Sequence, residues 1–263
     1  MIRSVNGHAL AYDDVGSGLP VVFLHGFPHD RSLWSSQLGA AALPTRCIAP
    51  DLRGFGESEG SATTIDDYAS DVIALMSALG IVKAVVVGLS MGGYVAMAMW
   101  RRNPRMVRAL VLVDTKATAD TDEGRAKRTE QIAFAKARGS AALADALMPG
   151  MVGKATRAMR PDLTERIHGM LARASTNGVV GALTAMRDRP DSTPTLATIT
   201  VPALIIVGDE DVLTPVSDAR AMNAGIAGSR LEIVNGAGHL SNVERPAAFN
   251  HLLSEFLASL ALT

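Results

Sequence analysis

Short runs of β-branched and other apolar residues recur along the chain, and stretches with helix-like spacing separate them. The runs occupy residues 21–24, 46–49, 84–87, 109–113, 203–207 and 231–234. Runs of this length without polar alternation are typical of parallel strands that are buried on both faces. Residues 64–79 and 249–260, by contrast, place their apolar side chains along one helical face. The pattern predicts the α/β fold class, with a mostly parallel central sheet flanked by helices.

The beginning and the middle of the chain depart from this alternation. Residues 1–18 alternate loosely around Asn6-Gly7, which predicts an amino-terminal hairpin. Residues 116–194 contain no strand-like run, and their helical spacings recur in pieces that glycine and proline separate. This part holds thirteen Lys or Arg against nine Asp or Glu, so its net charge is about +4 while that of the remainder is about −5. A helical segment is therefore predicted between two parts of an α/β core.

The stretch from residue 84 to residue 100 joins a buried strand to a helix through Gly88-Leu89-Ser90-Met91-Gly92. A serine on so sharp a turn has a strained backbone, and glycines two residues to either side let the turn close without Cβ clashes. G-x-S-x-G in this context predicts a nucleophile elbow, with the following helix aiming backbone N–H groups at developing negative charge. Two other interpretations are a turn built for close packing alone and a short membrane span. The decision depends on whether the chain also supplies a base, an acid and an oxyanion hole.

Two further motifs accompany the elbow: His25-Gly26-Phe27-Pro28 after one strand, and D-L-R-G-F-G-E-S at residues 51–58 after the next. Together with G-L-S-M-G-G-Y-V-A around the elbow, they resemble the α/β-hydrolase superfamily, and within it the serine carboxylesterase and 3-oxoadipate enol-lactonase-like group. The resemblance runs through most of the chain. It implies an α/β-hydrolase fold with a core at residues 1–115 and 195–263 and an inserted helical cap at residues 116–194.

A serine hydroxyl is a poor nucleophile at neutral pH and needs a base to take its proton. His239 is the only histidine in a loop just past a late strand, so it is the predicted base for Ser90. The resemblance implies the order Ser, Asp, His, and Asp211 matches the superfamily's G-x-x-D-x-x-x-P pattern at the end of the preceding strand. Asp211 is therefore the predicted acid. Asp114, at the end of the strand after the nucleophile, is the alternative, and Asp209 is expected to cap its own loop.

The resemblance also assigns the oxyanion hole. One N–H donor is Met91, directly after the nucleophile, and the second comes by position from Phe27. Pro28 has no N–H to donate, but its fixed φ stiffens the loop. His25 is expected to tie down loop backbone rather than to take part in catalysis.

Other residues are expected to brace or pack. Asp51 and Arg53 are interpreted as a structural pair that braces the loops around the site. The methionines of the helical segment are flexible enough to line an acyl pocket, although most of them are expected to fill the segment's own core. They are Met148, Met151, Met159, Met170 and Met186.

A serine nucleophile argues against the haloalkane dehalogenases and epoxide hydrolases of this superfamily, which use a carboxylate. The predicted function is a carboxylesterase that cleaves esters of small acyl substrates through an acyl-enzyme intermediate. A lactonase for a small anionic lactone is the alternative, and it should need a cap arginine facing Ser90. The candidates are Arg125, Arg128, Arg157, Arg160 and Arg173. A cofactor-free perhydrolase side activity and a non-catalytic ligand-binding role are further alternatives.

Composition narrows these classes. The chain has 263 residues, 48% of them hydrophobic, which is enough for a sizeable core. Its formal net charge is −1, so nucleic acid and membrane surfaces are not expected partners. Cys47 is the single cysteine and residues 1–10 lack an apolar signal core, which together predict a cytoplasmic protein. The sequence shows no His or Cys cluster for a metal and no phosphate-loop lysine, so neither metal nor cofactor is expected. The expected partner is a small ester or lactone, and a homodimer is left open.

Overall fold

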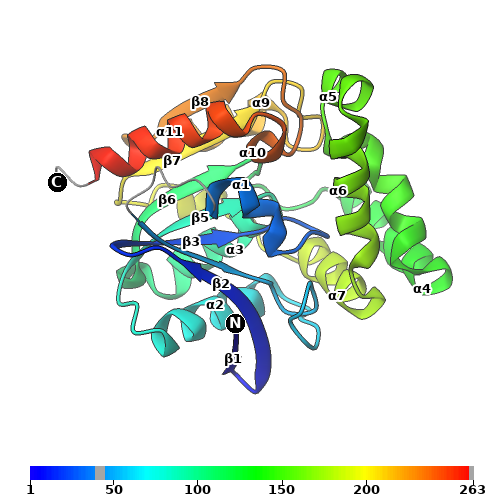
Figure 1. The fold of residues 1–263 in the computed structure, drawn as a ribbon, viewed down its shortest axis with the longest axis horizontal. Helices are drawn as coiled ribbons and strands as arrows, with labels where there is room; N and C mark the ends of the chain where they lie inside the picture. Colours follow the sequence, from blue (N-terminus) through cyan, green and yellow to red (C-terminus); the bar gives the residue numbers. More distant parts are fainter. Residues whose placement is uncertain (39–44, 261–263) are drawn as a thin grey trace.

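The computed structural model describes residues 1–38 and 45–260, and its centre is one eight-stranded sheet (Figure 1). The strands are β1 (Ile2–Val5), β2 (His8–Val15), β3 (Leu19–Leu24), β4 (Thr45–Pro50), β5 (Ala84–Leu89), β6 (Val107–Val113), β7 (Ala203–Gly208) and β8 (Arg230–Val234). Their order in the sheet is β1-β2-β4-β3-β5-β6-β7-β8, and all neighbours from β4 to β8 are parallel. Strands β1 and β2 form an antiparallel hairpin, and β2 also runs antiparallel to β4. The predicted mostly parallel sheet with an amino-terminal hairpin is confirmed.

Helices cover both faces of the sheet. One face carries α2 (Ile65–Ala78), α3 (Met91–Arg102) and α9 (Val216–Gly225), and the other carries η1 (Arg31–Trp34), α1 (Ser35–Leu38), α10 (Ser241–Glu244) and α11 (Pro246–Ser259) (Figure 1). The short helices η2 (Pro104–Met106) and α8 (Thr193–Leu196) precede β6 and β7. Side chains alternate between the two layers along each strand, so Val86 packs with α2 and α3 while Val85 and Val87 pack on the other face. Continuous apolar runs are therefore needed, because both faces are buried.

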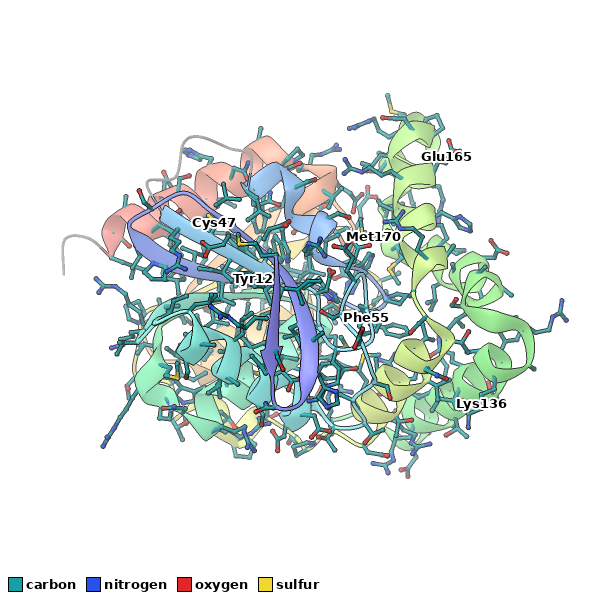
Figure 2. All side chains as sticks on the ribbon, turned by 60° about the horizontal axis from the view of Figure 1, so that its bottom comes forward. Tyr12, Cys47, Phe55, Lys136, Glu165 and Met170 are labelled. Atoms are coloured by element: carbon teal, nitrogen blue, oxygen red, sulfur yellow. The ribbon has the colours of Figure 1, made fainter. Side chains whose placement is uncertain are left out.

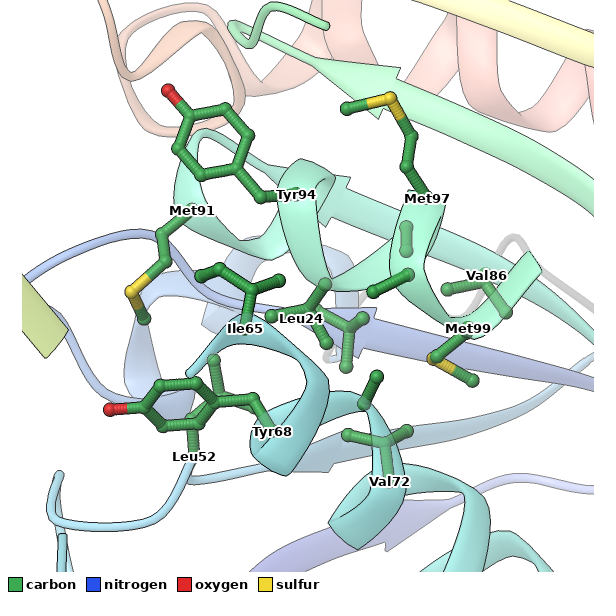
Figure 3. Close-up of a cluster of buried hydrophobic side chains, with 14 of the residues drawn as sticks. Leu24, Leu52, Ile65, Tyr68, Val72, Val86, Met91, Tyr94, Met97 and Met99 are labelled. Carbon is green, nitrogen blue, oxygen red and sulfur yellow. The ribbon is translucent and has the colours of Figure 1, made fainter. Parts of the chain in front are cut away.

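The layer that contains α2 and α3 shows how the sequence pattern becomes a core (Figure 3). Thr64 and Asp67 form a capping box, so α2 begins where the apolar pattern begins. Tyr68 and Val72 follow one turn apart and, with Val86 of the sheet, belong to one buried cluster. Burying side chains of this size stabilises the fold by about 1.5 to 3 kcal/mol each. This layer holds β5 and α3, which meet at Ser90, in fixed positions.

The residues between β6 and β7 form a separate group of helices at one side of the sheet (Figure 1). They are α4 (Asp122–Met151), α5 (Lys154–Met159), α6 (Pro161–Arg173) and α7 (Thr176–Arg187), named here the α4–α7 segment. The chain on the two sides of the segment is joined by hydrogen bonds. The N–H of Ser192 donates to the carbonyl oxygen of Ala117 at 2.9 Å, and Nη2 of Arg189 donates to that of Thr118 at 2.8 Å. The segment therefore leaves the sheet and returns to it at one point.

Packing of the α4–α7 segment accounts for most of its methionines. Met148, Met151, Met170 and Met186 are buried, whereas Met159 is 78% exposed. Met170 lies between the segment and the sheet (Figure 2). Met151 and Met186 also line a cavity next to Ser90. Both expected roles are therefore present, and the same side chains can fill both.

Candidate active site

Ser90 lies on the turn between β5 and α3, at the carboxyl edge of the sheet. Its φ is +53°, in the left-handed region, and its N–H donates to the carbonyl oxygen of Val113 at 2.9 Å. The neighbouring glycines are required for space. A Cβ on Gly88 would lie 2.3 Å from the carbonyl oxygen of Gly92, and a Cβ on Gly92 would lie 2.2 Å from that of Leu24. The stretch is therefore a strained strand-to-helix turn. Among the described residues, no helix is long and apolar enough to cross a membrane, so the interpretation of this stretch as a membrane span is wrong.

Ser90, His239 and Asp211 form one chain of hydrogen bonds. Nε2 of His239 lies 2.8 Å from Oγ of Ser90, and Nδ1 of His239 lies 2.8 Å from Oδ2 of Asp211. Asp211 follows β7 and His239 follows β8, so both come from loops at the edge that carries Ser90. The side chains of Asp211 and His239 are buried. The structure brings together the three residues that the sequence singled out on separate loops.

Asp211 is held by contacts besides the one to His239. Its Oδ1 accepts the N–H of Leu213 at 2.8 Å and that of Thr214 at 3.1 Å, and its Oδ2 accepts the Thr214 hydroxyl at 2.7 Å. Burial opposes ionisation, yet the charge of His239 and these hydrogen bonds leave the pKa of Asp211 below its ordinary value. Burial likewise opposes charge on His239, but Asp211 raises the pKa of the imidazole. A charged Asp211 at Nδ1 leaves Nε2 of the neutral imidazole able to accept the proton of Ser90.

Asp114 lies outside this chain of hydrogen bonds. Its Oδ1 accepts the N–H of Gly208 at 2.9 Å, and its Oδ2 accepts the N–H of Ser241 at 3.0 Å and the Ser241 hydroxyl at 2.7 Å. Burial, followed by the negative charge of Asp211, raises the pKa of Asp114 to about 7. Asp114 therefore connects the end of β7 to the loop of His239. Asp209 accepts the backbone N–H of Gly236, in the loop after β8, at 2.7 Å, so it connects two neighbouring loops instead of capping its own.

The loop after β3 packs against the elbow. A Cβ on Gly26 would lie 3.2 Å from Cβ of Ser90, so the loop backbone passes directly beside the nucleophile. The N–H of Phe27 has no acceptor among the described residues. Met91 is the first residue of α3, where a backbone N–H has no partner inside the helix. Two N–H groups next to Ser90 are thus available to an oxyanion.

The sequence predicted the bracing of these loops only in part. Nε2 of His25 accepts a backbone N–H of the loop after β4 at 2.9 Å, so its expected structural role is confirmed. The predicted Asp51–Arg53 pair is wrong. Asp51 accepts the N–H of Arg31 at 2.7 Å and pairs with its guanidinium, whereas Arg53 pairs with Asp71 of α2 at 2.5 Å. The two side chains leave the loop toward different elements, so each finds a partner there instead of its near neighbour.

A cavity of about 430 Å³, named here the first cavity, opens over Ser90 and His239. Its apolar lining includes Tyr94, Met151, Met186 and Leu213. Its charged lining consists of Lys116, Lys127, Arg128 and Asp120, three cations and one carboxylate with a net charge of +2. Asp120 lies 3.1 Å from Arg128 and 3.8 Å from Lys116, while Lys127 has no ion-pair partner among the described residues.

The predicted cap arginines fit this cavity poorly. Of the five candidates, only Arg128 lines it. Arg125 pairs with Asp188 and Arg160 with Asp162, on the outside of the segment. Sequence reasoning missed Lys116 and Lys127, although Lys127 precedes Arg128 directly. Among residues 1–38 and 45–260, no group of three or more His, Cys, Asp or Glu could hold a metal ion.

The chain is similar to known proteins over most of its length. The model of the Alpha/beta hydrolase family matches residues 21–252. The chain belongs to the α/β hydrolase family. A thermophilic esterase from Thermogutta terrifontis is 36% identical, with 98% of this chain and 97% of that chain covered and a TM-score of 0.94. The enol-lactonase from Burkholderia xenovorans is 30% identical, with 98% and 100% covered and a TM-score of 0.91.

A second enol-lactonase is also similar to this chain. 3-Oxoadipate enol-lactonase 1 of Acinetobacter baylyi is 28% identical, with 91% of this chain and 89% of the relative covered. The predicted α/β-hydrolase fold and the resemblance to the esterase and enol-lactonase group are therefore confirmed. The protein is an enzyme of the α/β-hydrolase superfamily.

Proposed function

We propose that this α/β hydrolase is a serine carboxylesterase that cleaves esters of small acyl substrates. The observation that carries the proposal is the 2.8 Å contact between Oγ of Ser90 and Nε2 of His239. It places a base where it can take the proton of the nucleophile. The similarity to a thermophilic esterase over nearly the whole chain supports the same activity.

In the proposed mechanism Ser90 attacks the ester carbonyl while His239 takes the hydroxyl proton. The oxyanion forms beneath the N–H groups of Phe27 and Met91, and each such donor contributes about 3 kcal/mol, or 10² to 10³ in rate. His239 then protonates the leaving alkoxide as its C–O bond breaks. A water molecule that gives its proton to His239 attacks the acyl enzyme, which releases the acid and restores Ser90. Asp211 stabilises the imidazolium in both steps.

Ser90→Ala tests the proposal. Turnover of p-nitrophenyl acetate should fall by at least about 10⁴-fold, because no other group can form the acyl enzyme. A fluorophosphonate should label wild-type protein once, at Ser90, and should not label the variant. Ser77→Ala, which changes an exposed serine of α2, is the matched control and should behave as wild type. Labelling of Ser90→Ala, or unchanged turnover in it, would refute the serine mechanism.

The charge of the first cavity favours a second candidate, a lactonase for a small lactone that bears a carboxylate. Three cationic side chains line the cavity and only one carboxylate, that of Asp120, does so. The cations are Lys116, Lys127 and Arg128. Two of the similar proteins are enol-lactonases, and the Thermogutta esterase was solved with malate bound. An enol-lactone is an ester, so the same mechanism would open it. A kcat/KM that is about tenfold higher for a carboxylated lactone than for its neutral counterpart and for acyclic esters would favour this candidate over the first.

A further inference from the structure

A backbone contact joins the α4–α7 segment to the loop of His239. A Cβ on Gly238, the residue before His239, would lie 2.3 Å from the backbone nitrogen of Gly153 and 2.6 Å from the carbonyl carbon of Val152. A Cβ on Gly153 would in turn lie 3.1 Å from the backbone nitrogen of Gly238. Glycine at both positions therefore allows the junction between α4 and α5 to pack directly on the backbone beside the proposed base.

Two carboxylates bind this junction. The N–H of Gly153 donates to Oε2 of Glu244 at 2.8 Å, and the N–H of Lys154 donates to Oε2 of Glu210 at 2.6 Å. Glu210 directly precedes Asp211 in the loop after β7, and Glu244 is the last residue of α10, which follows the proposed base. Consecutive N–H groups of the segment are thus bonded to the parts of the core that carry the proposed acid and the proposed base.

Glu244 also holds the loop of His239 itself. Its Oε1 accepts the N–H of Gly238 at 2.8 Å, so its two carboxylate oxygens bind the segment and the His239 loop at the same time. The residue is 1% exposed, and both hydrogen bonds are buried. Neither N–H could bond to solvent in place of the carboxylate, so the position of one backbone depends on that of the other.

The contact is separate from the side chains that would face a substrate. Neither Gly153 nor Glu244 lines the first cavity, whereas Met151, shortly before them in the segment, does. What Glu244 fixes is the backbone at Gly238, and with it the imidazole that follows. A base must lie within hydrogen-bond reach of the proton that it takes. A displacement of this loop is therefore expected to slow proton transfer instead of weakening binding.

We propose that Glu244 is a positioning residue, through which the docked α4–α7 segment keeps His239 in line with Ser90. The inference rests on the proposed esterase function and adds to it a connection from the segment to the base. Glu244 acts through the His239 loop and not through the substrate. If residues 153–154 moved away from the core, Glu244 would lose its second contact, and the 2.8 Å contact between the imidazole and the Ser90 hydroxyl would lengthen.

Glu244→Gln removes one acceptor and keeps the size of the side chain. An amide has a single acceptor oxygen, so the N–H of Gly238 or that of Gly153 loses its partner. For p-nitrophenyl acetate, kcat per site titrated to completion with a fluorophosphonate should fall by about 10- to 100-fold, because a small misplacement of the base suffices for such a loss. KM should stay within about twofold, since His239 serves both acylation and deacylation. Glu165→Gln, which changes an exposed glutamate of α6, is the control and should keep the wild-type kcat.

Gly153→Ala disturbs the same contact from the segment. Its Cβ would lie 2.5 Å from Oε2 of Glu210 and 3.1 Å from the nitrogen of Gly238, so the junction must move away from the loop. The value of kcat per titrated site should fall by about tenfold, although residue 153 does not line the first cavity. Gly169→Ala, in α6 of the same segment, is the control and should keep the wild-type kcat. When Gly153→Ala is combined with Glu244→Gln, the loss should be smaller than the product of the two single losses, because both changes act on one contact.

Titration separates positioning from stability, because unfolded material lowers the number of sites and not kcat per site. The inference is overturned if Glu244→Gln keeps the wild-type kcat per site, if KM changes in place of kcat, or if the two single losses multiply. Should Glu244→Gln not fold, equal kcat values in Gly153→Ala and Gly169→Ala overturn it. Wild-type turnover that is no faster than that of Ser90→Ala is a different result, because it overturns the proposed function and the inference with it.

Discussion

The loops at the carboxyl edge of the sheet and the α4–α7 segment contribute differently to the site. Ser90, Asp211 and His239 all follow strands of the sheet, and hydrogen bonds or close backbone contacts hold each of them. Lys127 and Arg128 come from α4, and the side chain of Lys127 is exposed and has no ion-pair partner among the described residues. The proposed reacting groups are therefore positioned by the sheet, while the charges that face a substrate come largely from the segment. Chemistry and substrate preference can change independently in such an arrangement.

The largest expected effect on the sheet side is at Asp211. Asp211→Asn should lower kcat by about 10⁴-fold, because an amide at Nδ1 no longer stabilises the imidazolium or favours the required tautomer. Asp114→Asn should lower kcat by less than about tenfold, because the Asp114 carboxylate contacts Gly208 and Ser241 rather than His239. Turnover of p-nitrophenyl acetate measures both. The opposite order of the two losses would assign the acid to Asp114.

Two glycine substitutions compare how closely the two regions are packed, and the free energy of unfolding is the quantity measured. In Gly92→Ala the new Cβ would lie 2.2 Å from the carbonyl oxygen of Leu24, so the free energy of unfolding should fall by about 3 kcal/mol or more. In Gly169→Ala, within α6, the nearest atom to the new Cβ would be Nη1 of Arg173 at 3.7 Å, which leaves room for it. The free energy of unfolding should therefore rise by up to about 1 kcal/mol. Urea unfolding followed by circular dichroism gives both values. Similar losses in both variants would contradict the proposed difference.

Lys127 tests the segment's part in substrate preference. The substrates are ethyl hemisuccinate, which carries a carboxylate, and ethyl pentanoate, which does not. Lys127→Ala should lower the ratio of their kcat/KM values by about two- to fivefold, the size expected for an exposed charge pair. Lys136→Ala removes the same charge from an exposed position on α4 outside the cavity and should leave the ratio unchanged. Equal losses in the two variants would point to a general field effect instead of a local contact.

The smallest expected effect is in the pH profile. His239 must be neutral to act as a base, so kcat/KM should fall as the pH drops through its pKa. Because Asp211 raises that pKa above the ordinary value of 6.5, the midpoint of the acid limb should lie above 6.5. Asp114 also raises it, so Asp114→Asn should move the midpoint to lower pH. Profiles of kcat/KM from about pH 5 to about pH 9 measure the shift, and a midpoint that rises in Asp114→Asn would contradict the charge argument.

What could be predicted from the sequence follows this division between the regions. The runs at residues 84–87 and 203–207 predicted their strands because a strand buried on both faces requires continuous apolar residues. The glycines around Ser90 predicted a tight turn, since no other residue fits so close to the facing carbonyl oxygens. The local sequence therefore carried the information for the sheet and its elbow.

Contacts between elements distant in the sequence were not predictable in this way. The interpretation of Asp51 and Arg53 as a pair failed because their partners belong to other elements. Nothing near His29 in the sequence predicts that neither ring nitrogen has a hydrogen-bond partner among the described residues, because such partners come from elements distant in the chain. Lys127 likewise faces the first cavity only through the packing of α4.

The hydrogen bond from Ser192 to Ala117 joins the two ends of the α4–α7 segment in one stem. Elsewhere the segment is bonded to loops of the core, as from the N–H of Gly153 to Glu244 at 2.8 Å and from the Ser175 hydroxyl to the carbonyl oxygen of Gly54 at 3.0 Å. A segment taken from another member of the family and grafted at this stem would meet an unaltered sheet and an unaltered nucleophile. New substrate ranges can therefore arise by exchanging one contiguous piece of the gene, provided that the new piece keeps these contacts to the loops of the core.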